Sequence, residues 1–329
     1  MMKNKSKKAL VTGAGGFIGS HLTERLVELG YKVRAFIRYN SRNFWGWLDD
    51  SPYKNDIEIF SGDIRNFDCV KTALKDVDIV FHLAALIGIP YSYYSPDSYV
   101  DTNIKGTVNV LQAARDLKIE RIIHTSTSET YGTAQIVPIA ETHSINPQSP
   151  YAASKSAADF MALSFCRSFN LPVAVVRPFN TFGPRQSGRA IIPTIISQLL
   201  NGKNTIRVGS LFPTRDFTYV KDVVEGFIKA SESKDAIGEV INLGSDFEIS
   251  IEELIKLISG IIGIRPKIIT EEKRKRPAAS EVERLWADTN KAKKILGWKP
   301  KYKLQQGLRE TIDWFKLHKD LYKTDIYNV

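Results

Sequence analysis

The amino-acid sequence predicts an α/β protein in which a doubly wound parallel sheet is followed by a smaller mixed α/β lobe. Three observations favour this fold class: a glycine-rich turn after the first apolar segment, regular alternation of strand-like and helical segments as far as Val176, and irregular order beyond it. With 329 residues, 43% of them hydrophobic, the chain is long enough to bury a core in each of two associated lobes.

The first expected elements are a buried strand over Ala9–Thr12 and a helix that ends near Leu29. Between them stands the pattern Gly13-x-x-Gly16-x-x-Gly19. The first glycine suits a tight turn, the second lets the backbone approach a pyrophosphate, and the third allows close packing of helix on strand. The helix N-terminus offers free N–H groups to phosphates. The pattern therefore predicts a Rossmann-type dinucleotide site rather than a plain structural turn.

The second and third strands carry the residues expected at the adenosine end of such a site. The second strand, over Tyr31–Ile37, is followed by Arg38, where a carboxylate would bind the ribose hydroxyls of NAD. Arg38 could pair with the 2′-phosphate of NADP or stack on adenine while NAD is bound, and the sequence leaves both open. The third strand, over Ile57–Phe60, leads to Asp63, which could bind the adenine amino group.

Three further strands complete the predicted sheet. They are expected over Asp78–Ala85, Arg121–Thr125 and Val173–Val176, and they are largely apolar, as strands covered on both faces should be. Long helices are expected over Tyr99–Leu117 and Tyr151–Phe169. Ligands bind outside the carboxyl ends of such strands, so the loops that follow them are candidate site segments.

Beyond residue 176 the order becomes mixed. Helices are expected near Ile191–Leu200, Val223–Ser231, Ile251–Ile262 and Gln305–Leu317, with short strands between them. The predicted organisation is a dinucleotide-binding domain over residues 1–176, to which a segment near 222–242 returns, and a smaller lobe over residues 177–329.

Two short segments, 125–132 and 151–155, concentrate reactive side chains. Tyr151 and Lys155 are four residues apart and so share one face of a helix. An ammonium beside a phenol favours the phenolate, so we expect Tyr151 to act as a base near neutral pH. Glu129 could be a second base or merely cap a turn, and Ser128 could assist it or bond to backbone.

Composition excludes several classes of function. The net charge is +10, but no basic face with interleaved aromatic residues is evident, which argues against nucleic-acid binding. No apolar run is long enough to span a membrane and no apolar signal segment follows the first lysines, so we expect a cytoplasmic protein. Cys69 and Cys166 lie within expected helices, which does not suggest a disulfide, and the scattered histidines predict no metal.

Together these motifs resemble the extended short-chain dehydrogenase/reductases that modify nucleotide-linked sugars, over essentially the whole chain. The resemblance rests on the glycine pattern, Asp63, His82–Ala85, Asn103, the Thr127 region, Tyr151-x-x-x-Lys155 and Arg177-Pro-x-Asn180. It implies that Tyr151 and Lys155 are the catalytic pair and that the hydroxyl of Thr127 orients the sugar 4-OH. It also implies a homodimer or homotetramer that associates through the two long helices.

The resemblance further implies the residues around the ligands. A tightly bound, recycled NAD(P) would be lined by Gly13, Gly16, Phe17, Ile18, Gly19, Arg38, Asp63, Ile64, Leu83, Ala84 and Ala85, together with Tyr151 and Lys155. The nucleotide-sugar would be bound in the smaller lobe by Asn180, Arg185, Arg215, Arg276 and Glu281. The cofactor is NAD by resemblance, and Arg38 leaves NADP open.

The sequence Thr127-Ser128-Glu129 is similar to that of GDP-mannose 4,6-dehydratases. Residues 39–47 and 184–193 look like the legionaminic acid pathway dehydratases, which act on N-acetylglucosamine linked to GDP or UDP. The resemblance implies oxidation at C4 with Tyr151 as base, removal of the C5 proton by Glu129, loss of the C6 hydroxyl with help from Ser128, and return of hydride to C6. The alternatives are the same reaction on UDP-N-acetylglucosamine or GDP-mannose, a UDP-glucuronate decarboxylase, a 4-epimerase and a non-catalytic sensor.

Overall fold

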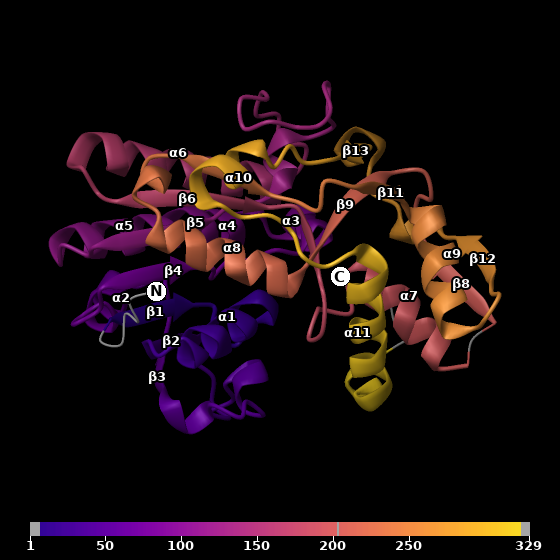
Figure 1. Cartoon of the computed structure of the whole chain (residues 1–329), viewed down its shortest axis with the longest axis horizontal. Helices are drawn as coiled ribbons and strands as arrows, with labels where there is room; N and C mark the ends of the chain where they lie inside the picture. The colour runs from indigo at the N-terminus through magenta and orange to yellow at the C-terminus, as the bar shows by residue number, and fades with distance from the viewer. Residues whose placement is uncertain (1–6, 203, 324–329) are drawn as a thin grey trace.

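The computed structural model describes residues 7–202 and 204–323, and its larger lobe is built on a seven-stranded sheet of order β10-β6-β5-β4-β1-β2-β3 (Figure 1). Its strands are β1 (Lys8–Thr12), β2 (Lys32–Arg38), β3 (Ile57–Gly62), β4 (Ile79–His82), β5 (Arg121–Thr125), β6 (Val173–Pro178) and β10 (Val240–Leu243). Every neighbouring pair is parallel. The strand order reverses between β1 and β4, which opens a crevice at their carboxyl ends. The predicted fold class is confirmed.

Helices cover both faces of this sheet, which explains its apolar strands. One face is covered by α1 (Phe17–Glu28) and α8 (Val220–Glu232), the other by α2 (Phe67–Ala73), α5 (Gly106–Asp116) and α6 (Pro150–Phe169). The first face shares its core with the smaller lobe, because Leu22 of α1 and Phe227 of α8 belong to the same buried cluster as Ile195 and Ile255. The two lobes are therefore packed on one another through apolar side chains.

The helix expected over Tyr99–Leu117 is interrupted in the structure. A short helix α4 (Pro96–Tyr99) passes through a π-helical turn, Val100–Lys105, into α5. Asn103 lies buried in that turn and its amide binds both backbone groups of Leu86, accepting from N at 2.8 Å and donating to O at 2.9 Å, and also reaches Ser154 Oγ at 2.9 Å. The π-turn thus ties the loop after β4 to α6, as π-turns at functional sites often do.

The smaller lobe is mixed, as expected. Strand β9 (Thr214–Tyr219) pairs antiparallel with β11 (Glu248–Ser250) and parallel with β13 (Arg284–Leu285) and β7 (Asn180–Phe182), while β8 (Thr205–Val208) pairs with β12 (Lys267–Thr270). The remaining helices are α3 (Ile89–Tyr94), α7 (Ile191–Leu200), α9 (Ile251–Ile262), α10 (Asn290–Leu296) and α11 (Leu304–Leu317). Short 3-10 helices occupy Gly46–Leu48, Lys54–Asp56, Ser128–Tyr131 (η4), Lys234–Ala236, Glu272–Arg274, Ala278–Ser280 and Lys319–Leu321.

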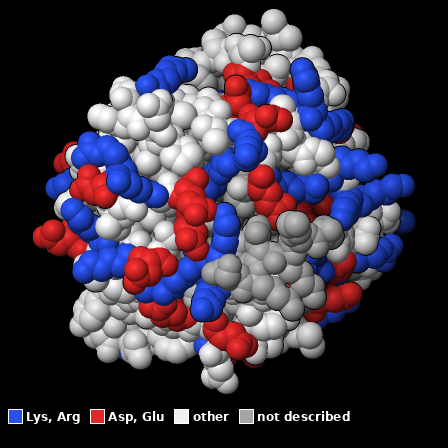
Figure 2. All heavy atoms as spheres, turned by 60° about the vertical axis from the view of Figure 1, so that its left-hand side comes forward, with Lys and Arg blue, Asp and Glu red and all other residues white. Residues whose placement is uncertain are grey.

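The surface carries mixed charge. Figure 2 shows basic and acidic side chains interspersed over the face that includes the left-hand side of Figure 1, with no continuous basic area among the described residues on that face. Within residues 7–202 and 204–323, none of the helices combines the length and the apolar character that a membrane span requires.

Candidate active site

A cavity of about 1060 Å³ lies between the lobes, at the carboxyl ends of β1, β4, β5 and β6. Of the site residues predicted from the sequence, all line this cavity except Arg185. Arg185 differs because it pairs with a residue that is distant in the sequence. The guanidinium of Arg185 makes two 3.0 Å hydrogen bonds to the carboxylate of Glu24 on α1, so it joins the lobes instead of facing a ligand. The geometry gives no support to a role for Arg185 in binding diphosphate.

The glycine-rich loop has the close approaches that a dinucleotide site needs. Gly13 has φ +70°, and a Cβ there would lie 2.9 Å from the backbone nitrogen of Ala84. A Cβ on Gly19 would lie 2.2 Å from the carbonyl oxygen of Gly13. Gly16 is the residue before α1, and no side chain caps the N-terminus of this helix. The N–H groups of its first turn can therefore donate to a phosphate. These residues fit a pyrophosphate.

At the adenosine end, Arg38 is exposed and makes no ion pair with the described residues. Asp63 is held by Arg65 at 2.6 Å, and that hydrogen bond lowers the pKa of the Asp63 carboxyl. Sequence reasoning missed Trp45 as a lining residue. Its carbonyl would lie 2.3 Å from a Cβ on Gly15, so the segment after β2 rests directly on the glycine loop. The aromatic run Phe-Trp-Gly-Trp was the signal that could have placed it.

Helix α6 delivers the tyrosine–lysine pair. Ser149 caps this helix by accepting from the N–H of Ala152 at 3.1 Å, so the next turn carries Tyr151 at a fixed angle. Both side chains of the pair are buried, with 8% of Tyr151 and 5% of Lys155 exposed. The ammonium of Lys155 donates to the carbonyl of Thr125 at 2.5 Å, at the end of β5.

The surroundings of Tyr151 act on its ionisation in opposite directions. Burial raises the pKa of the phenol above its ordinary value, a hydrogen bond with Thr127 lowers it, and the negative charge of Glu129 raises it. Burial also lowers the pKa of the Lys155 ammonium to about 8, while Asp159 raises it. Burial is the largest of these influences on Tyr151, and a cation bound beside the phenol would act against it.

A buried polar network supports the pair from beneath. Asp159, one turn beyond Lys155 on α6, accepts hydrogen bonds from the hydroxyl of Ser126, from Arg177 at 2.8 Å and from His124 at 3.1 Å. His82 accompanies His124 at 5.7 Å between ring centroids, and burial lowers the pKa of both imidazoles. Both are packed strand residues: His124 joins β5 to α6 through Asp159, and His82 joins β4 to Thr12 of β1 and to Thr107 of α5.

Glu129 is positioned by a rigid segment. Thr127 begins η4 and its hydroxyl accepts from the N–H of Glu129 at 3.3 Å. Tyr131 ends η4, is fully buried, and donates to Asn242 of β10 at 2.9 Å beneath the guanidinium of Arg177. The carboxylate of Glu129 is 7% exposed and lines the cavity.

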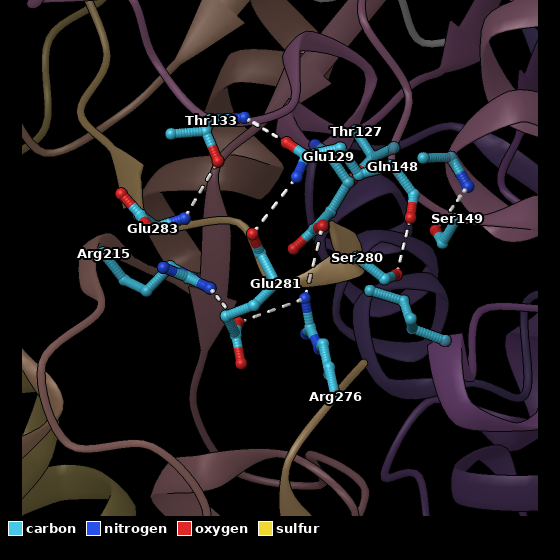
Figure 3. Close-up of polar contacts among 12 residues, drawn as sticks. Thr127, Glu129, Thr133, Gln148, Ser149, Arg215, Arg276, Ser280, Glu281 and Glu283 are labelled. Carbon is cyan, nitrogen blue, oxygen red and sulfur yellow. Dashed lines mark hydrogen bonds and ion pairs between the residues drawn. The ribbon is translucent and has the colours of Figure 1, made fainter. Parts of the chain in front are cut away.

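The opposite wall holds the predicted basic residues. Figure 3 shows the guanidinium of Arg276 between the carboxylates of Glu129 and Glu281, with Arg215 reaching Glu281 from the other side. The nitrogen–oxygen distances are 3.5 Å from Arg276 to Glu129, 3.8 Å from Arg276 to Glu281 and 3.3 Å from Arg215 to Glu281. Asn180 lines the same region, and its buried carbonyl oxygen has no hydrogen-bond partner.

The charge of the lining is strongly positive. It comprises the basic residues Arg38, Arg65, Lys155, Arg189, Arg215, Arg274 and Arg276 against the acidic residues Asp63, Glu129 and Glu281. Arg189 and Arg274 are lining residues that sequence reasoning missed, because nothing in their local sequence separates them from surface arginines. A basic recess of this kind suits phosphorylated ligands.

The fold and the site define a dinucleotide-dependent enzyme with a tyrosine–lysine pair facing a basic recess. The chain belongs to the nucleotide-sugar epimerase/dehydratase family of extended short-chain dehydrogenase/reductases: the GDP-mannose 4,6-dehydratase family model matches residues 10–311. It is 34% identical to a putative UDP-glucose 4-epimerase of Methanocaldococcus jannaschii, over 93% of this chain and 98% of that protein. It is 32% identical to human dTDP-D-glucose 4,6-dehydratase, over 94% and 90%.

A solved structure supports the same assignment. UDP-glucuronic acid 4-epimerase from Bacillus cereus, in complex with NAD and a fluorinated UDP-glucuronic acid, superimposes with a TM-score of 0.87. It is 32% identical, and the alignment covers 96% of this chain and all (100%) of that one. These similar proteins include epimerases and a dehydratase, so the reaction must be argued from the site itself.

Proposed function

We propose that this protein is a nucleotide-sugar 4,6-dehydratase that converts GDP-N-acetylglucosamine to the GDP-linked 4-keto-6-deoxy sugar. The observation that carries the proposal is the carboxylate of Glu129, which lines the same cavity as Thr127, Tyr151 and Lys155. A 4-epimerase needs only an alcohol to be oxidised and reduced again. Elimination of water also needs a base for the C5 proton, and Glu129 provides one.

The cofactor is proposed to be a nicotinamide dinucleotide, NAD by comparison with the Bacillus cereus epimerase. The glycine loop, Asp63 and the segment 83–85 would hold it. When bound, its oxidised ring supplies a hydride acceptor and a positive charge. The raised pKa of the Tyr151 phenol fits such a partner, because the phenol ionises only where cations face it.

The residues of the chain then divide the remaining work. Thr127 and Tyr151 hold the sugar 4-OH, and Tyr151 takes its proton as hydride leaves C4. The ketone at C4 acidifies the hydrogen on C5, which Glu129 removes. The C6 hydroxyl leaves as water with a proton, helped by the buried Ser128. Hydride is then returned to C6 while C5 takes up a proton that exchanges with solvent, which completes the 6-deoxy sugar. No net oxidation occurs, so the enzyme is a lyase.

The substrate diphosphate is proposed to lie against Arg215, Arg276 and Asn180. Two arginines can bind phosphate oxygens by charge-assisted bonds, and the side-chain NH2 group of Asn180, which lines the same part of the cavity, can donate a further hydrogen bond to them. The choice of GDP and of N-acetylglucosamine is supported by the resemblance of residues 39–47 and 184–193 to the legionaminic acid pathway dehydratases.

One observation favours a second candidate, a UDP-glucuronate decarboxylase. Such an enzyme needs a cation for the carboxylate that its substrate carries on C5. Arg276 supplies one, since its guanidinium lies 3.5 Å from Glu129 at the cavity wall. The two candidates differ in what leaves the sugar, water or carbon dioxide.

The discriminating experiment is an NMR assay in deuterium oxide with GDP- and UDP-N-acetylglucosamine, GDP-mannose and UDP-glucuronate. The proposal expects deuterium at C5 and loss of the C6 oxygen with GDP-N-acetylglucosamine. Glu129→Gln should still reduce the cofactor but release little dehydrated sugar. Product that keeps its C6 oxygen, or release of carbon dioxide from UDP-glucuronate alone, would overturn the proposal.

We also propose a homodimer or homotetramer that associates through α5 and α6. Helix α6 exposes Phe160 and Phe169, at 58% and 48%, on its outer side. Light scattering of the purified protein tests this, and a strict monomer would contradict it.

A further inference from the structure

Segment 276–283 lies along the cavity wall, and the side chain of Gln148 joins it to the end of η4, the short helix that carries Glu129 (Figure 3). The Gln148 amide nitrogen donates to the carbonyls of Ala279 and Glu281, each at 3.1 Å. Its amide oxygen accepts from the N–H of Thr133 at 2.6 Å, just beyond η4. Ser280 donates to the backbone carbonyl of Gln148 at 2.5 Å. Gln148 therefore clamps segment 276–283 to the end of η4.

The clamp lies where three functional parts meet. Gln148 immediately precedes Ser149, which caps the helix of Tyr151. Gly132 directly follows η4 with φ +66°, and a Cβ there would lie 2.7 Å from the amide oxygen of Gln148, so the end of η4 and the clamp are in direct contact. A further hydrogen bond, from the N–H of Glu283 to the hydroxyl of Thr133 at 3.1 Å, reinforces the same junction.

The ion pairs at this junction differ from the hydrogen bonds of Gln148, because the substrate diphosphate would compete for the arginines that form them. Without ligand, Arg276 is shared between Glu129 and Glu281, and Arg215 binds Glu281. A diphosphate brought against the two arginines draws them toward its own negative oxygens and weakens their hold on Glu129 and Glu281. The uncharged bonds of Gln148 do not compete with phosphate. They remain to hold Glu129 in register when the ion pairs exchange.

We propose that Gln148 is a positioning residue that couples the diphosphate-binding segment 276–283 to the base Glu129. This inference rests on the proposed function, because it gives Glu129 the task of removing the C5 proton. It places the effect of Gln148 on elimination, since Lys155 is held separately by the carbonyl of Thr125, and α6, which carries Tyr151, is held by the network around Asp159.

The test is Gln148→Met, which keeps the length of the side chain and removes its polar bonds. The matched control is Gln198→Met. Gln198 makes the same pattern of bonds between α7 and β8, donating to the carbonyls of Thr194 at 3.1 Å and Arg207 at 3.2 Å and accepting from the N–H of Arg207 at 2.8 Å. Gln198 does not line the cavity. Gln198→Met therefore measures the effect of losing such hydrogen bonds at a position away from the site.

In single-turnover experiments with GDP-N-acetylglucosamine, Gln148→Met should reduce the cofactor at the wild-type rate. Release of the dehydrated sugar and deuterium uptake at C5 should fall at least about tenfold, so that reduced cofactor accumulates, with KM little changed. Gln198→Met should show wild-type partition between the two steps. Equal loss of oxidation and elimination in Gln148→Met would reduce Gln148 to a structural role and overturn the inference.

A second measurement separates this inference from the proposed function. Hydrogen exchange with and without GDP should show protection of both segments 127–133 and 276–283 in the wild type and in Gln198→Met. In Gln148→Met only segment 276–283 should be protected. If no sugar is dehydrated but this loss of coupling is seen, the proposed reaction is wrong and the coupling stands. Protection of both segments in Gln148→Met would overturn the coupling.

Discussion

Tyr151 is buried, although the proposed reaction requires its phenol to act as a base. Its phenol is buried beside Thr127 and Glu129, and both burial and the carboxylate oppose the phenolate. The hydrogen bond with Thr127 favours the phenolate, and a cationic ring bound beside it would favour it further.

Replacement of Tyr151 by Phe should lower turnover by roughly 10²- to 10⁴-fold, the usual range for loss of a general base. Binding of GDP and the melting temperature should stay close to those of the wild type, because only a hydroxyl is lost. Tyr99→Phe is the matched control. That residue loses a buried hydroxyl bonded to the carbonyl of Gly88 but lies outside the cavity lining, so its turnover should fall little. Unchanged turnover in Tyr151→Phe would remove the proposed base.

Arg38 is the residue at which the choice between NAD and NADP can be tested. It ends β2, is exposed at the cavity wall, and has no carboxylate beside it other than Asp63, which Arg65 already holds, among the lining residues that the structure describes. Charge-assisted bonds to a phosphate contribute roughly 1.5–3 kcal/mol. Arg38→Asp should therefore raise the ratio of the Kd for NADP to that for NAD by about tenfold to a hundredfold. Titration of the cofactor-free protein measures both constants, and an unchanged ratio would mean that Arg38 only stacks on adenine.

At the scale of elements, α6 carries three functional side chains in successive turns, Tyr151, Lys155 and Asp159. The first two face the cavity, and the third anchors the helix to β5 and β6 through Ser126, His124 and Arg177. Tyr151 and Lys155 thus face the cavity, while Asp159, near the middle of α6, holds the helix in place. Loss of Asp159 leaves the guanidinium of Arg177 buried without its carboxylate, which is a costly arrangement.

Asp159→Asn should lower the free energy of unfolding by about 3–5 kcal/mol at pH 7, the usual cost of breaking a buried ion pair. The hydrogen bond from His124 and the charges of Arg177 and Lys155 overcome burial and lower the pKa of Asp159 to about 2. A lowered folded-state pKa stabilises above the unfolded value of about 4 and is lost as pH falls toward 2. The difference between wild type and variant should therefore shrink over that interval.

Urea unfolding at a series of pH values measures this difference. Asp116→Asn is the control, because Asp116 pairs with Lys71 and Arg115 at the surface and its loss should leave the free energy of unfolding nearly unchanged. A difference for Asp159→Asn that does not change between pH 5 and pH 2.5 would show that the ionisation of Asp159 contributes nothing.

The elements that sequence patterns could predict are those set by local burial. Helices α7 and α9 have the expected bounds, since their apolar periodicity ends at turn residues. The π-turn around Asn103 could not be read in this way, because it depends on partners in the loop after β4 and in α6. Its apolar pattern is that of an ordinary helix.

The same distinction applies to the site: residues in local motifs could be predicted, and residues with distant partners could not. Gly13 and Tyr151 belong to motifs whose spacing specifies their place, and both face the cavity. Arg185 was expected at the cavity but does not line it, because it pairs with Glu24. Glu24 is distant in the sequence, and no local pattern indicates that pairing. Gln148 is likewise silent in the sequence, since its role arises from three segments that meet only in the folded chain.

At the scale of the whole molecule, the cavity joins two lobes that share one apolar core. The larger lobe contributes the glycine loop and the base, and the smaller lobe contributes the arginines. A ligand that spans both binds only the folded, closed arrangement and must stabilise it. The excess of basic over acidic side chains in the lining makes phosphate the group that the recess selects.

A nucleoside diphosphate should therefore raise the melting temperature. At a hundredfold excess over Kd a ligand adds about 2.7 kcal/mol to the folded state, which corresponds to several degrees. GDP should give a larger shift than UDP at equal concentration, guanosine should give almost none because it lacks the diphosphate, and raised salt should reduce the effect. Arg215→Ala, which removes one cation of the recess, should lower the shift by GDP. A larger shift with UDP would contradict the proposed GDP-linked substrate while leaving the elimination chemistry of Glu129 untouched, since the base and the nucleotide are recognised at opposite ends of the sugar diphosphate.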